Sequence, residues 1–235
     1  MIEVQKLDAG YGKIQVLYEV NIVAHPQRIT VIVGPNGSGK STLLKSIMGA
    51  TTIYSGTIRF DGHDITAGPK HEIAKMGIAY LPQVDSVFTR LTVRENLIMA
   101  GYTVEREELE AREQEVLDMF PFLRERMDTK AHTLSGGERQ MLAMAMALVR
   151  RPRVVMFDEP TAHLAPRIAE QVFDKIIELR DKLNLTILLV EQNALKALEI
   201  GDDAYLLVSG RTAYSGPASE LLANPELGKM YLGLQ

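Results

Sequence analysis

The amino-acid sequence predicts an α/β fold: a mainly parallel sheet with an N-terminal antiparallel β subdomain and an inserted helical subdomain. The first observation is a set of apolar runs without polar alternation, typical of strands buried on both faces of a parallel sheet, at residues 29–34, 154–159 and 186–192. The second is an alternating or turn-rich pattern, typical of antiparallel strands, at residues 2–7, 14–24 and 56–62. The third is a helical pattern from about residue 87 to 150.

The elements of the predicted core follow from local signals. A glycine-rich turn after the first apolar run leads into a helix that starts near Lys40. An amphipathic helix over residues 169–183 connects the second and third runs, which predicts a β-α-β crossover. Residues 205–216 predict a hairpin that turns at Ser209-Gly210, and residues 219–234 predict a final short helical region.

The predicted helical insertion has its own start and stop signals. Thr92 and Glu95 fit a capping box before an apolar stretch. The charge-rich helix of residues 104–123 is stopped near Pro121, because proline cannot continue a helix. We therefore expect one domain of 235 residues, with a helical subdomain at about 87–150 and a core made of residues 1–86 and 151–235.

Composition and charge exclude several classes of protein. The net charge is −4, which does not favour nucleic acid or an anionic membrane surface as a partner. The chain has no cysteine, and this excludes disulfides and thiolate metal sites. Its first residues lack the pattern of a signal peptide. The longest apolar run, residues 141–149, is far shorter than a bilayer span. We expect no direct insertion into a membrane, so that any membrane association goes through a partner.

The stretch GPNGSGKS at residues 34–41 matches the phosphate-loop motif G-x-x-x-x-G-K-[ST], between a predicted strand and a predicted helix. This context predicts the core of a P-loop NTPase rather than a turn that binds nothing. Lys40 is expected to reach the β- and γ-phosphates of ATP, and the Ser41 hydroxyl to ligate Mg²⁺. Residues expected to contact the nucleotide are Gly34, Pro35, Asn36, Gly37, Ser38, Gly39, Lys40, Ser41 and Thr42.

A second acidic element, VVMFDEP, occupies residues 154–160. Asp158 ends a predicted strand at the same edge of the sheet as the phosphate loop, where its carboxylate can hold Mg²⁺. Glu159 follows and can polarise an attacking water molecule as the catalytic base. Alone, these two residues would indicate only an exposed strand end; the phosphate loop makes them candidates for ATP hydrolysis.

LSGGERQ, residues 134–140, opens a helix in an unusual way. Ser135 and Glu138 fit a capping box, yet Gly136 and Gly137 occupy the first turn, where each glycine costs about 1 kcal/mol relative to alanine. A helix start with a serine cap and bare backbone can bind an anion through its N–H groups and dipole. Since residues 34–41 already supply a phosphate site, this second site suggests contact with a nucleotide held by another molecule.

LSGGERQ resembles the signature sequence of ATP-binding cassette (ABC) proteins, and the likeness covers essentially the whole chain. In that family two cassettes pair head to tail, and each ATP lies between one phosphate loop and the opposing signature. The resemblance implies that Ser135, Gly136 and Gly137 contact the γ-phosphate held by the partner. It also implies that Tyr11 stacks on adenine and that Gln83 touches both Mg²⁺ and the attacking water.

Several positions depart from the family pattern. Gln192 stands where most cassettes carry a histidine after the third strand; it can hydrogen-bond to the γ-phosphate but cannot take up a proton. In the loop TAHLAP (161–166), His163 replaces a usual glycine and Ala165 a usual aspartate. Gln27 and Arg28 replace a glycine-containing turn. Because of these departures, Glu159 is the expected acid–base group of the site. The resemblance does not imply contacts between the two cassettes through residues 161–166.

The motif VEQNA at residues 190–194 and the closing YLGLQ look most like the smaller ATP-binding subunit of branched-chain amino acid importers. The resemblance implies an ATPase coupled to transport, at the cytoplasmic face of the membrane, with integral permease subunits as partners. The resemblance also implies that such subunits dock at residues 85–96. The alternatives are a soluble ABC ATPase acting as an assembly or mechanical factor, a nucleotide kinase, and a binding module that does not hydrolyse ATP.

Overall fold

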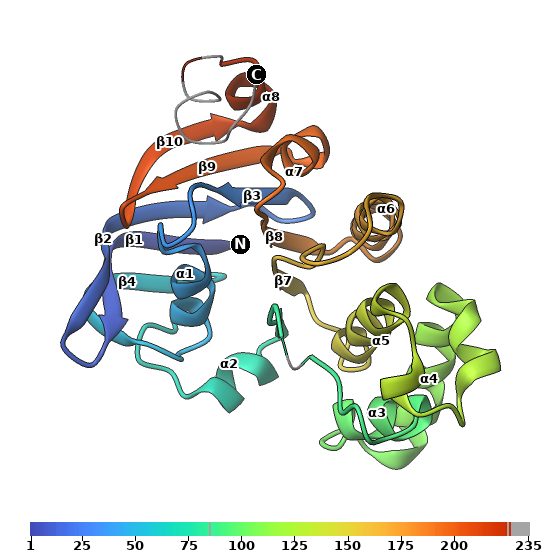
Figure 1. The fold of residues 1–235 in the computed structure, drawn as a ribbon. Helices are drawn as coiled ribbons and strands as arrows, with labels where there is room; N and C mark the ends of the chain where they lie inside the picture. Colours follow the sequence, from blue (N-terminus) through green and yellow to red (C-terminus); the bar gives the residue numbers. More distant parts are fainter. Residues whose placement is uncertain (85, 225, 227–235) are drawn as a thin grey trace.

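Two sheets organise the molecule, which a computed structural model describes over residues 1–84, 86–224 and 226. The first is antiparallel, in the order β2-β1-β4-β5 (Figure 1). Its strands are β1 (Ile2–Tyr11), β2 (Ile14–Ala24), β4 (Thr52–Phe60) and β5 (His63–Asp64). The N-terminal antiparallel subdomain is therefore confirmed, although β1 runs further and β4 starts earlier than the patterns predicted.

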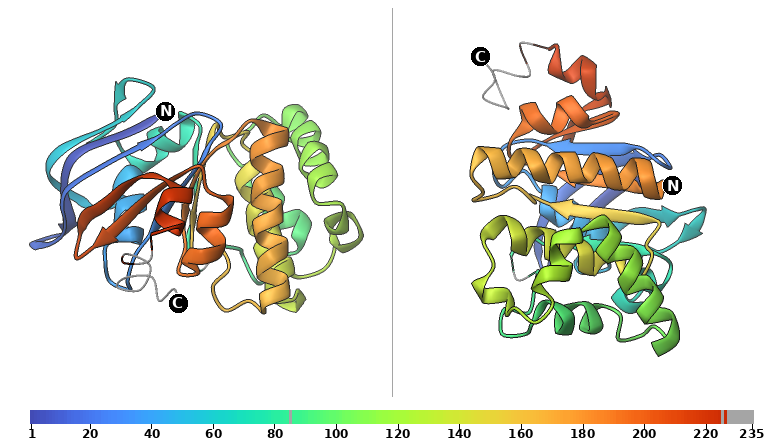
Figure 2. Two further views of the ribbon diagram at one scale, coloured as in Figure 1. Left: turned by 90° about the horizontal axis from the view of Figure 1, so that it is seen from above. Right: turned by 90° about the vertical axis from the view of Figure 1, so that its right-hand side faces the viewer.

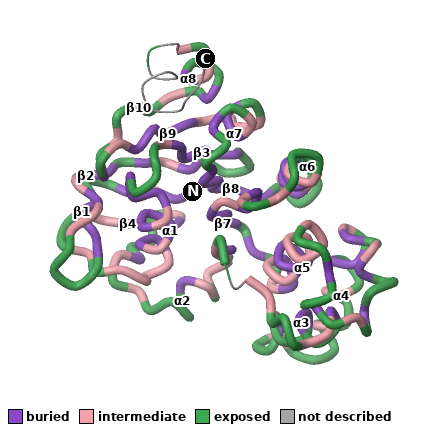
Figure 3. The backbone as a smooth tube through the Cα atoms, viewed as in Figure 1, coloured by how far each residue is buried: buried purple, intermediate pink, exposed green. Residues whose placement is uncertain are grey.

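The second sheet has the order β10-β9-β3-β8-β7-β6, and all neighbours except β9 and β10 are parallel. Its strands are β3 (Ile29–Val33), β6 (Ile78–Leu81), β7 (Val154–Asp158), β8 (Thr186–Val190), β9 (Asp203–Val208) and β10 (Arg211–Pro217). Every residue of β3, β7 and β8 is buried, as the continuous apolar runs predicted (Figure 3). The α/β class with a mainly parallel sheet is confirmed.

Helices connect these strands. Their bounds are α1 (Lys40–Ile47), α2 (Lys70–Lys75), α3 (Val93–Ala100), α4 (Arg106–Met119), α5 (Gly136–Leu148), α6 (Pro166–Leu183), α7 (Ala194–Ile200) and α8 (Ala218–Leu222), with 3-10 turns η1 (Pro121–Arg126) and η2 (Ala131–Thr133). Both predicted capping boxes are formed, one at α3 and one at α5. α6 joins β7 to β8, so the predicted β-α-β crossover is also present.

The parallel sheet separates two hydrophobic cores. One core joins the antiparallel sheet to one face of the parallel sheet and includes Leu43, Leu44 and Ile47 of α1. The other core lies on the opposite face and includes α5, α6 and α7, with Leu142 and Ile176 fully buried. Helices α1 and α5 therefore lie on opposite faces of one sheet, and Figure 1 shows them well apart.

The predicted helical insertion corresponds to α3, α4 and α5, which the chain places between β6 and β7. These two strands pair directly, so the insertion leaves the sheet and returns to it (Figure 2). The exact boundaries of the subdomain, about 87 and 150, stay a prediction. Within the described ranges, no helix combines the length and the apolar character that crossing a bilayer requires.

Some elements were not expected from the sequence. β6 has only four residues, too few for a periodic pattern, yet it forms the edge strand beside β7. α2 and α7 are likewise short helices without a clear signal. The hairpin was expected: β9 and β10 turn at Ser209 and Gly210, whose φ values of 49° and 76° fit a tight two-residue turn. Most of the predicted last helical region lies outside the described residues, and α8 is its described part.

Candidate nucleotide site

The glycine-rich loop of residues 34–39 joins the end of β3 to the start of α1. Gly34 and Gly39 have φ values of 147° and 101°, a region that side chains rarely adopt. A Cβ atom at Gly34 would lie 2.0 Å from the carbonyl oxygen of Leu207, and one at Gly39 would lie 2.6 Å from Leu17. Only glycine fits at these two positions, because β9 and β2 brace the loop from outside.

Lys40 is the first residue of α1, and its side chain folds back over the loop. Its Nζ atom donates hydrogen bonds to the carbonyl oxygens of Gly34, at 2.9 Å, and of Pro35, at 3.2 Å. The same atom lies 4.0 Å from Oε1 of Glu159. Burial lowers the pKa of the Lys40 ammonium, and nearby carboxylates, chiefly that of Glu159, oppose this shift. The positive charge of Lys40 is thus only partly neutralised, and it lies against the glycine-rich loop.

Ser41 and Asp158 meet at the carboxyl edge of the parallel sheet. The Ser41 hydroxyl donates to Oδ1 of Asp158 over 2.7 Å, and the Tyr80 hydroxyl donates to Oδ2 over 2.8 Å. Burial and the charge of Asp158 raise the pKa of Tyr80 far above its ordinary value, so the phenol stays a donor. The pairing of Ser41 with Asp158 brings together two residues that the sequence proposed as Mg²⁺ ligands.

Glu159 directly follows β7, and Gln83 follows the neighbouring strand β6. Gln83 donates a hydrogen bond from Nε2 to Oε2 of Glu159 over 3.0 Å. Glu159 has a φ of 50°, a strained conformation that turns the chain away from the sheet at this point. Two of the predicted catalytic residues are therefore in direct contact, and the turn after β7 sets where the carboxylate points.

Tyr80 is a site residue that sequence reasoning missed. It lies three positions before Gln83 in the stretch YLPQ, where no strand was predicted. Because β6 pairs with β7, with Tyr80 opposite Met156, its hydroxyl comes within reach of Asp158. A strand predicted at β6 would have indicated that Tyr80 lies near Asp158, since the carboxyl ends of parallel strands lie at one edge of the sheet.

Gln192 follows β8 and is exposed. It shares a cavity of about 410 Å³ with Glu159 and His163. Its neighbour Glu191, which the sequence did not single out, is buried in the wall of the same cavity. The structure thus brings Gln192 to the same cavity as the predicted base Glu159, and its contact with the γ-phosphate stays a prediction. Tyr11, at the end of β1, is 44% exposed, and its contact with adenine stays a prediction.

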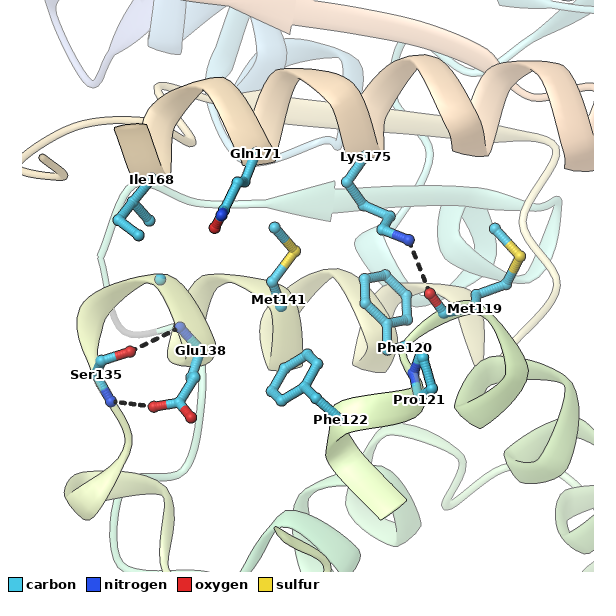
Figure 4. A pocket seen from close by; sticks show the side chains of 11 residues that line it. Met119, Phe120, Pro121, Phe122, Ser135, Glu138, Met141, Ile168, Gln171 and Lys175 are labelled. Atoms are coloured by element: carbon cyan, nitrogen blue, oxygen red, sulfur yellow. Dashed lines mark hydrogen bonds between the residues drawn. The ribbon is translucent and has the colours of Figure 1, made fainter. Parts of the chain in front are cut away.

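The second predicted phosphate contact lies at the start of α5. Ser135 caps this helix: its hydroxyl accepts from the Glu138 amide at 3.2 Å, and the Glu138 carboxylate accepts from the Ser135 amide at 2.8 Å (Figure 4). Ser135 and Gly136 are exposed, and Gly137 is half-buried. The amide groups of the first turn are thus presented at the surface, as an anion site at a helix start requires.

The two glycines of this turn differ in how closely the rest of the chain approaches them. A Cβ atom at Gly137 would lie 2.5 Å from Cγ2 of Ile168 on α6, so packing within the chain already requires a glycine there. A Cβ atom at Gly136 would lie 3.2 Å from the end of the Leu164 side chain, which can move. Packing against α6 therefore gives Gly137 a reason of its own, and contact of both glycines with a ligand stays a prediction.

Two positions where the resemblance led us to expect glycine keep a glycine-like backbone. His163 has a φ of 64° and Gln27 a φ of 60°. A residue with a side chain in this left-handed backbone region costs about 1–2 kcal/mol of stability, and the surrounding structure must offset this cost. The loop after β7 and the turn before β3 therefore have the conformation of glycine-containing turns although the glycines are replaced.

This arrangement defines the class of the protein. A glycine-rich loop between a buried parallel strand and a helix, with lysine, serine and aspartate side chains converging at its mouth, is a nucleoside-triphosphate site of the P-loop type. The sequence model described as ABC transporter matches residues 17–162, and the chain belongs to this family. It is an ABC ATPase domain, and it binds ATP.

Relatives and solved structures agree with this family. The chain is 56% identical to the protein named probable branched-chain amino acid transport ATP-binding protein LivF of Archaeoglobus fulgidus, with 100% of this chain and 99% of the relative covered. It is 41% identical to the high-affinity branched-chain amino acid transport ATP-binding protein BraG of Pseudomonas aeruginosa, over 99% and 100%. A crystal structure of the ADP conformation of an ATP-binding cassette superposes with a TM-score of 0.88 at 27% identity, covering 97% of both chains.

Proposed function

We propose that this chain is the ATP-hydrolysing subunit that energises an importer of branched-chain or other hydrophobic amino acids. The two relatives above support this cargo class, because both carry branched-chain amino acid transport in their names and match at nearly full length. The observation that carries the ATPase chemistry is the convergence of Lys40, Ser41, Asp158 and Glu159 at one sheet edge. The experiments below separate this function from two of the alternatives, the assembly factor and the pure binding module.

Nucleotide binding rests on the loop and its lysine. The backbone N–H groups of the glycine-rich loop, except at Pro35, and the start of α1 offer donors and a positive dipole end to the β- and γ-phosphates. Lys40 adds a charge whose present partners, apart from Glu159, are neutral carbonyl oxygens. A polyphosphate is a stronger acceptor than these carbonyls, so the ammonium is free to exchange them for phosphate oxygens.

The site fits Mg²⁺. The Ser41 hydroxyl and the Asp158 carboxylate are oxygen donors 2.7 Å apart, and the Gln83 amide oxygen belongs to the adjacent strand end. Mg²⁺ favours such sparse oxygen ligands together with phosphates and water over a dedicated protein cage. In the described part of the chain, no cluster of three or more His, Cys, Asp or Glu forms such a cage. When bound, Mg²⁺ would neutralise charge on the phosphates.

Glu159 is the proposed base for hydrolysis. Oε2 accepts from Gln83, and Oε1 lies 4.0 Å from Lys40, so the carboxylate is held between the two. It can take the proton of a water molecule that attacks the γ-phosphate, a role that typically contributes about 10²–10⁴-fold. Gln192, across the same cavity, can donate a hydrogen bond to the γ-phosphate but cannot act as an acid or base.

Two ABC subunits are proposed to enclose each ATP. The start of α1 and the start of α5 belong to helices on opposite faces of one sheet, which argues against both reaching one phosphate within a single chain. A head-to-tail pair solves this problem. The start of α5, with Ser135, Gly136 and Gly137, then meets the γ-phosphate of a nucleotide on the second subunit, whose own signature meets the nucleotide bound at Lys40. Tyr11 is proposed to stack on adenine.

The proposed permease interface is centred on residues 85–96, the last four of which belong to α3. A groove of about 330 Å³ runs between β6 and α5 and is lined by Tyr80, Pro82, Ser86, Ala100 and Met146 among others. The segments before and within α3, and the turn that follows it, carry exposed large apolar side chains: Val84, Phe88, Ile98, Met99 and Tyr102. Large exposed apolar side chains are candidates for a protein interface. Docking here would place the chain at the cytoplasmic face of the membrane without a span of its own.

The docking proposal can be tested by recovery of membrane proteins with the tagged chain. Phe88, which is 49% exposed, is replaced by glutamate, and Leu183, which is 43% exposed on α6, is replaced likewise as a control. We expect F88E to lose the integral membrane subunits and ATP-dependent leucine uptake, while L183E and the wild type keep both. Equal recovery by F88E would contradict the assigned surface. Uptake that does not respond to ATP would contradict the transport function.

A further inference from the structure

Glu191 is a buried carboxylate directly after β8, with a relative exposure of 2%. In the part of the chain that the structure covers, no lysine, arginine or histidine lies within ion-pair distance of it, and burial raises its pKa. An unpaired buried carboxylate is costly unless hydrogen bonds replace its lost water. The functions proposed above make no use of Glu191, which raises the question of what it holds.

Both oxygens of Glu191 accept from backbone and side chain of the two loops that flank the catalytic cavity. Oε1 accepts from the amide of Thr161, at 3.0 Å, and from its hydroxyl, at 2.7 Å. Oε2 accepts from the amide of Gln192 at 3.1 Å, and the Asn193 amide also bonds to the carboxylate. With these four donors the carboxylate is engaged inside the chain and is not available to a nucleotide.

The position of these bonds follows from the end of the parallel ladder. Strands β7 and β8 pair up to Asp158 and Val190, and the Glu159 amide makes one more bond, to the Val190 carbonyl at 2.9 Å. The chain then turns away at Glu159, whose φ is 50°. The buried amide of Thr161 has no strand partner beyond this point. The Glu191 carboxylate takes the place of the missing strand acceptor, as buried amides require one.

We propose that Glu191 is a positioning residue for ATP hydrolysis: it joins the turn that carries Glu159 to the segment that carries Gln192. Fixing Thr161 limits how far the strained turn at Glu159 can relax, and fixing the Gln192 amide sets the opposite wall of the cavity. Loss of this link changes the aim of Glu159 at the attacking water and leaves the phosphate loop and Lys40 in place. This inference rests on the proposed ATPase function.

The test uses the full chain with MgATP, assembled with its partner subunits. In E191Q the amide NH₂ group has to face either the Thr161 donors or the Gln192 and Asn193 amides, so half of the link is lost. T161V removes the shorter bond, and T161S retains it. T186V is the matched control, since it deletes a buried threonine hydroxyl that accepts from Gln27 at 3.1 Å, at the opposite end of β8.

We expect kcat to fall about 10–100-fold in E191Q and about 10-fold in T161V, as a displaced base of this kind typically causes. T161S and T186V should stay within about twofold of the wild type, and the MgATP affinity of all four variants should be unchanged. Hydrogen exchange should show faster exchange at the Thr161 amide in E191Q and T161V. This pattern separates positioning from a general loss of structure, which would lower affinity and activity together.

The inference is overturned if T161V and T161S have the same kcat, or if affinity falls in parallel with kcat. Should E191Q fail to fold, the Thr161 pair alone decides. An active wild type with fully active variants would refute the role of Glu191 and leave the proposed function intact. An inactive wild-type assembly would instead refute the proposed function and with it the hydrolytic role of Glu191.

Discussion

Ser41 and Asp158, 117 positions apart in the chain, share a hydrogen bond of 2.7 Å at the carboxyl edge of the parallel sheet. Ser41 is the second residue of α1 and Asp158 is the last of β7, so the contact joins the end of the phosphate loop to the strand that leads into Glu159. In nucleotide sites of the P-loop type, the serine of the loop and an aspartate at a strand end together hold Mg²⁺, directly or through water. These two groups therefore have to lie close together. Two of the four predictions below, those on Glu159 and Lys40, concern this edge of the sheet, and the other two concern the start of α5.

Replacing Glu159 by glutamine should preserve MgATP binding and lower the hydrolysis rate by about 10²–10⁴-fold, because the amide cannot accept the proton of the attacking water. The variant should also accumulate as an ATP-bound dimer in size-exclusion chromatography. E170Q, an exposed glutamate of α6 in the wall of the same cavity, is the control and should hydrolyse normally. Normal hydrolysis by E159Q would show that the base has been assigned wrongly.

Replacing Ser135 by arginine should abolish turnover of the assembled pair and leave the MgATP affinity of the separate chain nearly unchanged. The reason is that Ser135 lies at the exposed start of α5, on the other face of the sheet from α1. S219R, at the exposed start of α8, is the matched control. Calorimetric titration of the monomer checks the affinity, and a large loss there would contradict a contact across two chains.

Replacing Gly137 by alanine should destabilise the chain by about 1–3 kcal/mol, the usual cost of overpacking. The added methyl group would lie 2.5 Å from Ile168, which belongs to the first turn of α6. I168A should relieve the clash, so the double variant should melt closer to I168A than to G137A. G136A should have a smaller effect, since only the tip of Leu164 has to move. Equal melting temperatures for G136A and G137A would argue against this packing.

Replacing Lys40 by methionine should weaken MgATP binding by about 10–100-fold, the usual loss for a charged hydrogen bond. Without nucleotide it should raise the melting temperature, because burial lowers the pKa of Lys40 and the fold disfavours its charged form. This penalty is complete below the lowered pKa and disappears as pH rises through the ordinary value of 10.5. The stability gap between variant and wild type should therefore shrink at alkaline pH; a constant gap would mean that charge is not its cause.

Sequence patterns were sufficient for the elements whose signals are local. Three fully buried strands, both capping boxes and the turn at Ser209-Gly210 lie where the periodicity and turn chemistry predicted them. A capping box needs only residues three positions apart, and a buried strand needs only a continuous apolar run. The resemblance to ABC proteins, carried by short motifs, was confirmed by the family match.

What only the tertiary structure decided depends on residues far apart in the chain. The four residues of β6 have no distinctive pattern, and their pairing with β7 is what brings Tyr80 to Asp158 and Gln83 to Glu159. Likewise, the need for glycine at position 137 comes from Ile168, 31 residues away along the chain by their numbers.

Glu191 is the clearest case. Nothing in the sequence distinguishes Glu191 from other polar residues at a strand end. Its carboxylate links two loops because β7 and β8 end side by side. The sequence by itself determined which chemical groups the chain carries and which local elements form, because those elements depend on residues close together in the chain. Which of these groups meet was decided by strand order and helix packing, because those contacts form only when distant segments bury a common core.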